Sequence, residues 1–151
     1  MSREAAAGGR ILGIDPGSKS IGVAVSDELL LAAHGLPSIP ARPEAAALNA
    51  VKSLIHEYTI YEIVVGLPVN MDGTMGSSAE AAQRFARNLE GLLPGGVHMV
   101  DERLTTVQAE RTLIEADVSR GKRRDLRDRV AAILILQNHL DRLRHAREDR
   151  D

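Results

Sequence analysis

The sequence predicts a single α/β domain with a mixed five-stranded sheet, in which an antiparallel three-strand meander comes first, parallel strands follow, and helices lie on both faces. The first observation behind this prediction is the opening stretch, residues 10–27, which has the pattern of two short strands joined by a tight turn. The second is the remaining chain, where helix-like and strand-like segments alternate. An antiparallel start followed by β-α-β units produces a mixed sheet covered by helices. The length of 151 residues suits one domain with a sizeable core.

The opening hairpin is predicted from its strands, ILGI over 11–14 and IGVAV over 21–25. Their β-branched residues suit a pleated, largely buried surface. The turn between them contains Pro16-Gly17, in which proline presets φ and glycine allows φ > 0. Leu29–Ile39 predicts a third strand beside the second, and its prolines place its end at the edge of the sheet.

The rest of the chain is predicted from helix-start signals and hydrophobic spacing. Proline at a first helical position and two matches to the capping box mark helix starts. A continuous apolar run marks a strand that is covered on both faces. The predicted elements are a helix over 43–58, a strand over 60–67, a helix over 78–90, a strand over 97–100, and helices over 105–116 and 126–143. We expect a flexible tail over 1–9, the domain over 10–143 and a polar C-terminal tail over 144–151.

The composition excludes several classes of function. There is no cysteine, so disulfides, thiolate metal sites and cysteine nucleophiles are absent. Aromatic residues make up 2% of the chain, which nearly excludes base stacking on aromatic platforms. A net charge of -2 means that any nucleic-acid-binding surface must be local. No stretch has the length of a signal peptide or a membrane span, so we expect a soluble cytoplasmic protein without a membrane partner.

Acidic residues stand at three predicted element ends. Asp15 lies where the first strand enters its turn, Asp101 and Glu102 leave the fifth strand, and Asp128 lies in the first turn of the last helix. The carboxyl ends of parallel strands form the edge where ligands bind in open sheets. Each acid also has a structural interpretation: Asp15 as the start of an Asx-turn, Asp101 as the partner of Arg103, and Asp128 as a complement to the helix dipole. The coincidence of three sites favours a functional cluster.

Carboxylates that lie close together repel one another unless a cation is present. Oxygen ligands without cysteine favour Mg²⁺ or Mn²⁺, and the candidate ligands are Asp15, Asp101, Glu102 and Asp128. Two such ions would activate a water molecule and stabilise the leaving oxygen of a phosphodiester.

A basic run adjoins one of these acids. Its cations are predicted to lie in a loop over 119–124 and at the start of the last helix, where they would hold the phosphates of a polyanionic substrate. Such a run is more commonly a solvated loop. The predicted nucleic-acid-binding residues are Lys19, Arg103, Arg120, Lys122, Arg123, Arg124 and Arg127.

Four motifs together resemble the YqgF/RuvX family. They are GIDPGSKSIGVAVSD over 13–27, IVVGLPVNMDGT over 63–74, VDERLTT over 100–106 and DRVAAILILQ over 128–137. The resemblance covers nearly the whole chain, in order. One departure is Ser20, which occupies a position where the family usually has arginine.

The resemblance implies an RNase H-like fold and a divalent-metal site made of acidic residues. Carried over by motif, the catalytic acids are Asp15, Glu102 and Asp128, and Asp101 is either a fourth ligand or a carboxylate behind the ligands. We rank Glu102 above Asp101, because a residue just beyond a strand points more freely into a cleft.

The family is described as Holliday-junction-resolvase-like and as a nuclease that processes pre-16S rRNA. The leading hypothesis is therefore a metal-dependent endonuclease with a two-metal-ion mechanism, acting on pre-16S rRNA in ribosome biogenesis, with ribosomal precursor particles as further partners. One alternative is resolution of four-way DNA, which calls for two active sites and hence a homodimer, whereas a monomer favours the RNA substrate. Another is a non-catalytic nucleic-acid-binding factor in ribosome maturation or transcription.

Overall fold

A computed structural model of the protein describes residues 9–104 and 120–150. Within them, the strands form one sheet in the order β3-β2-β1-β4-β5. The pairs β1–β2 and β2–β3 are antiparallel, and the pairs β1–β4 and β4–β5 are parallel. The strands are β1 (Arg10–Asp15), β2 (Ser20–Ser26), β3 (Ala33–Pro40), β4 (Ile60–Leu67) and β5 (Val97–Asp101). The predicted mixed sheet, with its meander followed by parallel strands, is confirmed.

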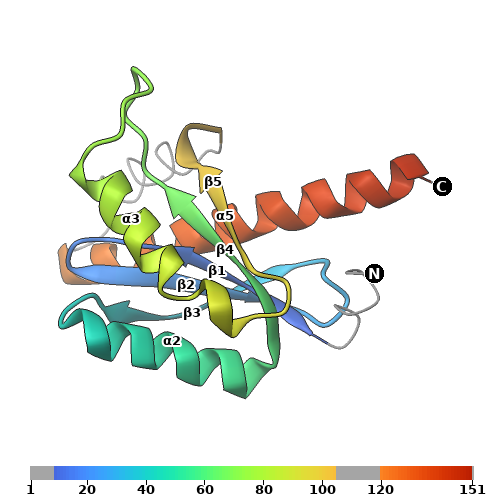
Figure 1. The fold of residues 1–151 in the computed structure, drawn as a ribbon, viewed down its shortest axis with the longest axis horizontal. Coiled ribbons are helices and arrows are strands. Elements are labelled where there is room, and N and C mark those ends of the chain that lie inside the picture. The colour runs from blue at the N-terminus through green and yellow to red at the C-terminus, as the bar shows by residue number, and fades with distance from the viewer. Residues whose placement is uncertain (1–8, 105–119, 151) are drawn as a thin grey trace.

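Helices cover both faces of this sheet, as predicted (Figure 1). Helices α2 (Glu44–Tyr58) and α3 (Ser77–Arg87) pack on one face, and the long helix α5 (Arg120–Arg150) crosses the other. Two short 3-10 helices, η1 (Glu90–Leu92) and η2 (Glu102–Leu104), flank β5. The helix predicted over 105–116 lies outside the described residues.

Alternation along the strands divides the core into two layers, because successive side chains of a strand point to opposite faces. Leu12 and Ile14 of β1 pack in the layer under α2 and α3, whereas Ile11 packs under α5. The α5 layer also holds Ala24 and Val64 of the neighbouring strands. Helix α5 contributes residues at helical spacing to this layer, namely Ala131, Ala132, Ile135, Leu136 and Leu140.

Glycines on the sheet let α5 approach closely. A Cβ atom on Gly22 of β2 would lie 2.1 Å from the carbonyl oxygen of Asp128, and one on Gly13 of β1 would lie 2.7 Å from Cβ of Leu136. Both distances are far below van der Waals contact, so neither position accepts a side chain without movement of the helix. The absence of these side chains therefore sets how closely α5 lies on the sheet at Asp128 and at Leu136.

The third strand begins later than predicted. Residues 27–32 form a turn in which the Leu31 N–H donates to the Asp27 carboxylate at 2.8 Å. The Leu30 N–H donates to the Asp27 carbonyl oxygen at 3.2 Å, and Leu30 adopts a φ of 60°. These local hydrogen bonds compete with the sheet, and β3 starts only at Ala33.

The last helix is longer than predicted at both ends. The basic loop expected over 119–124 is wrong from Arg120 onward, where α5 begins, and the helix continues to Arg150 instead of ending near Leu143. Lysine and arginine are good helix formers, so a charged segment next to a packed helix extends it readily. The capping box predicted for α3 is also not formed, because the helix begins after Gly76 without a side-chain cap.

Gln137 joins α5 to the start of β3. Its side-chain carbonyl oxygen accepts from the Ala33 N–H at 2.9 Å, and its amide donates to the Leu31 carbonyl oxygen at 2.9 Å. Gln137→Met is expected to lower the free energy of unfolding by roughly 1–3 kcal/mol, because two backbone groups lose their partner. Urea unfolding would measure this change. Gln83→Met, the same substitution in α3, is the matched control, and equal stability of the two variants would contradict the role of Gln137.

Candidate active site

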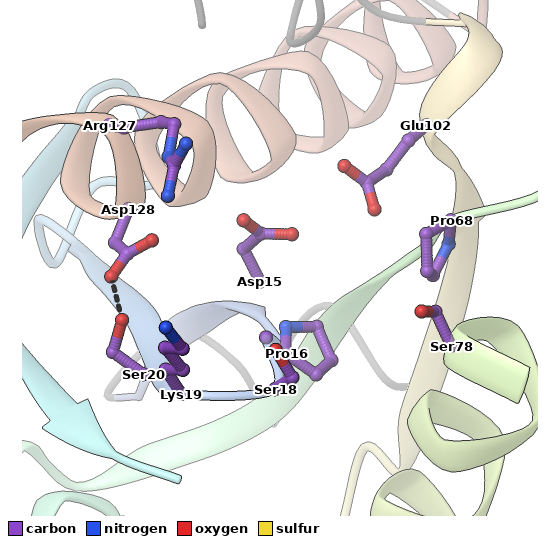
Figure 2. Close-up of a pocket in the computed structure, with 11 residues that line it drawn as sticks. Asp15, Pro16, Ser18, Lys19, Ser20, Pro68, Ser78, Glu102, Arg127 and Asp128 are labelled. Carbon is purple, nitrogen blue, oxygen red and sulfur yellow. Dashed lines mark hydrogen bonds between the residues drawn. The ribbon is translucent and has the colours of Figure 1, made fainter. Parts of the chain in front are cut away.

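Three acidic side chains are buried at one edge of the sheet. Asp15 is 4% exposed, Glu102 is 3% exposed and Asp128 is 8% exposed, and they are the buried charged residues of the described chain. Burial of an ionised carboxylate is costly unless a partner or a cation compensates it. All three line a single cleft, shown in Figure 2.

Strand geometry brings Asp15 and Glu102 to this edge. Asp15 is the last residue of β1, and Glu102 directly follows β5. Because β1, β4 and β5 run parallel, their carboxyl ends meet at the same edge, as predicted. Asp15 also continues the alternation of Ile11 and Gly13, which directs its side chain toward the α5 face.

Asp128 reaches the same cleft from the third turn of α5 and not, as predicted, from the first turn, because the helix begins at Arg120. Its backbone lies directly over Gly22, which fixes where the carboxylate enters the cleft. Its Oδ2 atom accepts a hydrogen bond from the Ser20 hydroxyl group at the start of β2. Ser20 lies two residues before Gly22 and therefore points to the same face of the sheet. In Figure 2 the Asp15 carboxylate lies between those of Asp128 and Glu102.

Two cations share the cleft with these acids. Lys19, from the turn after β1, and Arg127, from α5, both line it. This placement fits their predicted role in holding phosphate groups. Arg120, Lys122, Arg123 and Arg124 belong to the first turns of α5, but their side chains lie outside what the structure describes.

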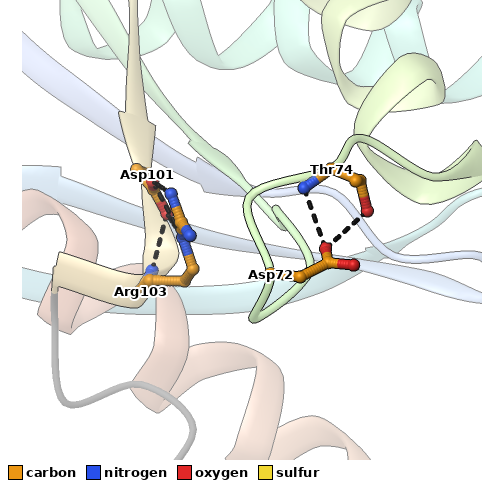
Figure 3. A network of polar contacts seen from close by, with 4 residues as sticks. All are labelled: Asp72, Thr74, Asp101 and Arg103. Atoms are coloured by element: carbon orange, nitrogen blue, oxygen red, sulfur yellow. Dashed lines mark hydrogen bonds and ion pairs between the residues drawn. The ribbon is translucent and has the colours of Figure 1, made fainter.

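Asp101 and Arg103 are not brought into the cleft. The Arg103 guanidinium group donates to both oxygens of the Asp101 carboxylate, at 2.7–3.2 Å, and the Arg103 backbone N–H donates at 2.9 Å (Figure 3). These hydrogen bonds from Arg103 lower the pKa of Asp101. The structural interpretation weighed for Asp101, an ion pair that shapes the turn after β5, matches this geometry. The carboxylate that lines the cleft is that of Glu102.

Arg103→Ala is expected to raise the pKa of Asp101 toward its ordinary value. In the folded wild-type protein this pKa lies below that of the unfolded chain, so the ion pair stabilises the fold at neutral pH. That contribution is lost as the pH falls through the lowered pKa. Carboxyl NMR titration would measure the change. The pKa of Asp72 should rise less than that of Asp101, because it is lowered chiefly by hydrogen bonds from Thr74 and only to a small extent by the charge of Arg103. An Asp101 pKa that stays low would contradict the assignment.

Comparison with known proteins agrees with this architecture. A family model described as "RuvX: Holliday junction resolvase" matches residues 9–142. The chain belongs to the RuvX family. A relative from Moorella thermoacetica, named "Putative pre-16S rRNA nuclease", is 54% identical over 134 residues, covering 89% of this chain and 96% of the relative. A relative of the same name from Bacillus cereus is 50% identical over 135 residues, covering 88% of this chain and 98% of the relative.

The fold of this RuvX-family chain is also found in a solved structure. Thermus thermophilus RuvC, determined in complex with a Holliday junction substrate, superposes with a TM-score of 0.56. The superposition covers 89% of this chain and 96% of RuvC at 15% sequence identity. The likeness confirms the predicted RNase H-like fold. In the described part of the chain, no helix combines the length and the apolar character that a membrane span requires.

The donor set of the RuvX-family cleft fits a divalent cation that prefers oxygen. Its three buried acids are Asp15, Glu102 and Asp128, and it offers no sulfur ligand. As the side chains are placed, no group of three acidic or histidine residues among those described forms a ready-made metal site.

Several residues that line the cleft were not predicted as site residues from the sequence, among them Ser20, Pro68 and Ser78. Pro68, just after β4, and Ser78, in the first turn of α3, complete its lining. Residues 77–80 match the capping-box pattern, so Ser78 was interpreted as part of a helix start and not as a site residue. The signal available was topological: the segment after β4 leaves the same sheet edge as Asp15 and Glu102.

Proposed function

We propose that this protein is a metal-dependent endonuclease that cleaves phosphodiester bonds in structured nucleic acid, with pre-16S rRNA as its substrate. The observation that carries the proposal is the cleft, where three buried carboxylates lie beside two cations. Metal-dependent hydrolysis of a phosphodiester needs acidic groups that bind the metal ions and basic groups beside them that bind the phosphates of the substrate. Membership of the RuvX family and the names of the relatives support the choice of reaction and substrate.

Asp15, Glu102 and Asp128 would hold the cations, Mg²⁺ or Mn²⁺. We assign Asp15 and Asp128 to one ion and Asp15 and Glu102 to a second, because Asp15 lies between the other two acids (Figure 2). Such ions, when bound, lower the pKa of an attacking water and neutralise the leaving 3′-oxygen, which yields a 5′-phosphate and a 3′-hydroxyl. Asp101 is left out of this set, because its carboxylate is held by Arg103.

Residues around the acids hold and orient the substrate. Lys19 and Arg127 line the cleft on the Asp128 side of Asp15, where they would bind phosphates next to the scissile bond. The Ser20 hydroxyl group holds one oxygen of Asp128 and leaves the other directed toward the cleft. The chain therefore supplies both the charge that holds the cations and the charge that holds the substrate.

The deciding experiment compares a 5′-extended pre-16S rRNA fragment with a four-way DNA junction. Each is incubated with Mg²⁺, with Mn²⁺ and with EDTA. Metal-dependent removal of the RNA extension supports the proposal. Symmetric nicking of the junction would favour the second candidate, a Holliday junction resolvase, which the description of the family model supports. Binding without cleavage under every condition would overturn catalysis and leave a nucleic-acid-binding factor.

Ser20→Ala is expected to slow cleavage roughly 10–100-fold, because loss of a partner that orients a metal ligand has effects of this size. The Mg²⁺ concentration needed for half-maximal cleavage should rise as well. Ser20→Thr keeps the hydroxyl group and should retain most of the activity, which makes it the matched control. Equal activity and equal Mg²⁺ dependence in Ser20→Ala and wild type would show that the hydrogen bond to Asp128 does not contribute.

A further inference from the structure

A loop beside the cleft presents an apolar side chain to solvent. This segment, residues 69–76, is called the Met71 loop, and it projects from the sheet edge between β4 and α3 (Figure 1). Pro68, which precedes the loop, and Ser78, which follows it, both line the cleft. Met71 is 76% exposed, the highest exposure among the large hydrophobic residues that the structure describes.

The Met71 loop is held in shape by its own hydrogen bonds. Across the loop, the Asn70 N–H donates to the Thr74 carbonyl oxygen at 3.0 Å, and the Gly73 N–H donates to the Asn70 carbonyl oxygen at 2.9 Å. The Asp72 carboxylate accepts from the Thr74 N–H at 2.9 Å and from its hydroxyl group at 2.6 Å (Figure 3). Gly73 has a φ of 89°, a conformation that favours glycine. The loop is therefore pre-organised around its exposed methionine.

Arg103, just after β5, lies next to the Met71 loop. Its guanidinium group is bound by Asp101 and lies near the loop, since a Cβ atom on Gly73 would be 3.7 Å from Nη1. The charge of Arg103 also contributes to the lowered pKa of Asp72. Arg103 is thus held by Asp101 at a position next to the Met71 loop.

An unpaired nucleobase is the partner that best fits this surface. Structured RNA exposes unpaired bases in loops, bulges and ends, and proteins bind them through the flat face of the base. The chain has 2% aromatic residues and no Trp, so it offers few aromatic side chains on which a base could stack. Methionine has a polarisable thioether that packs well on aromatic rings, and it is among the side chains that insert between base steps.

We propose that Met71 is a wedge that packs against an unpaired base of the nucleic-acid substrate next to the cleft. The proposal rests on the proposed function, because the ligand of the cleft must be a nucleic acid. The wedge would let the protein recognise an unpaired base, a feature that the acidic cleft cannot distinguish. The cleft holds phosphates, which every nucleic acid has, whereas the wedge selects strands with an unpaired base beside the scissile phosphate.

The test measures binding without cleavage, in EDTA, by fluorescence anisotropy. One probe is an RNA duplex with an unpaired extension that contains 2-aminopurine, and the other is the fully paired duplex. Met71→Ala should weaken binding of the first probe roughly five- to tenfold and leave the second unchanged. Met71→Phe, which restores a flat apolar surface, should bind the first probe at least as well as wild type. Leu92→Ala, which truncates a 46% exposed leucine in η1, is the matched control.

Each outcome decides the proposal. Equal binding of the unpaired probe by Met71→Ala and wild type overturns the wedge, and if wild type still cleaves the rRNA fragment, the proposed function stands without it. A selective loss in Met71→Ala, combined with no cleavage by wild type, supports the wedge and overturns the nuclease. A loss that is equal for both probes overturns the wedge, since it does not depend on unpaired bases. Circular dichroism of Met71→Ala verifies its fold.

Discussion

Asp15→Asn is expected to abolish cleavage of the pre-16S rRNA fragment while nucleic-acid binding persists. Asp15 ends the central strand β1 and lies between the other two buried acids, so it is the one carboxylate assigned to both ions. Asparagine keeps the size of the side chain but removes its charge. Loss of a group that only orients a ligand costs roughly 10–100-fold, so loss of a shared ligand should cost more. Cleavage would be measured with excess protein over labelled RNA, and binding by anisotropy in EDTA.

Asp101→Asn tests whether Asp101, and not Glu102, is the metal ligand at the end of β5. Asp101 is next to Glu102 in the chain, but its carboxylate is occupied by Arg103 outside the cleft. We therefore expect Asp101→Asn to retain cleavage and Glu102→Gln to lose it. Loss of cleavage in Asp101→Asn with retention in Glu102→Gln would reverse the assignment. Unchanged turnover by Asp15→Asn would end the proposed mechanism altogether.

Features that depend on strand order and strand ends could be predicted from the sequence. The hairpin and the β-α-β pattern indicated which strands run parallel, and parallel strands bring their carboxyl ends to one edge. Asp15 and Glu102 were predicted as candidates in this way, since each stands at such an end. The choice of Glu102 over Asp101 rested on the weak argument that the residue beyond the strand is freer, and the structure places Glu102 in the cleft.

Features that depend on contacts between distant segments could not be predicted. Ser20 and Asp128 are separated by 108 residues, and no local pattern indicates that their side chains meet. The apolar residues of the last helix predict an inward face of Val130, Ile133, Leu134, Leu136 and Leu140. This prediction missed Ile135, which is fully buried in the α5 layer. The start of this helix was also misplaced, since a basic segment has similar composition in a loop and in an exposed helical turn. In each case tertiary packing decides between locally equivalent alternatives.

Gly22→Ala is expected to lower both stability and cleavage, because the added methyl group would displace the first turns of α5. Its Cβ atom would lie 2.1 Å from the Asp128 carbonyl oxygen and 3.2 Å from the Asp128 Cα atom. These are backbone atoms, which cannot avoid the clash by a rotamer change as the end of a long side chain can. Overpacking of this kind costs roughly 1–3 kcal/mol in the free energy of unfolding. A shift of about 1 Å in a catalytic group can cost roughly 10²-fold in rate.

Gly91→Ala is the matched control, because an added Cβ atom there meets nothing within 4 Å. Urea unfolding measures stability, and cleavage is compared under conditions where both variants are folded. Gly66→Ala provides a graded case if Gly22→Ala does not fold: its Cβ atom would meet the flexible end of Ile135 at 2.5 Å and Cγ of Glu102 at 3.3 Å. Its loss of stability should be smaller, because side-chain ends can move, while cleavage should still fall through Glu102. Wild-type stability and cleavage in both glycine variants would show that the close seating of α5 does not position the acids.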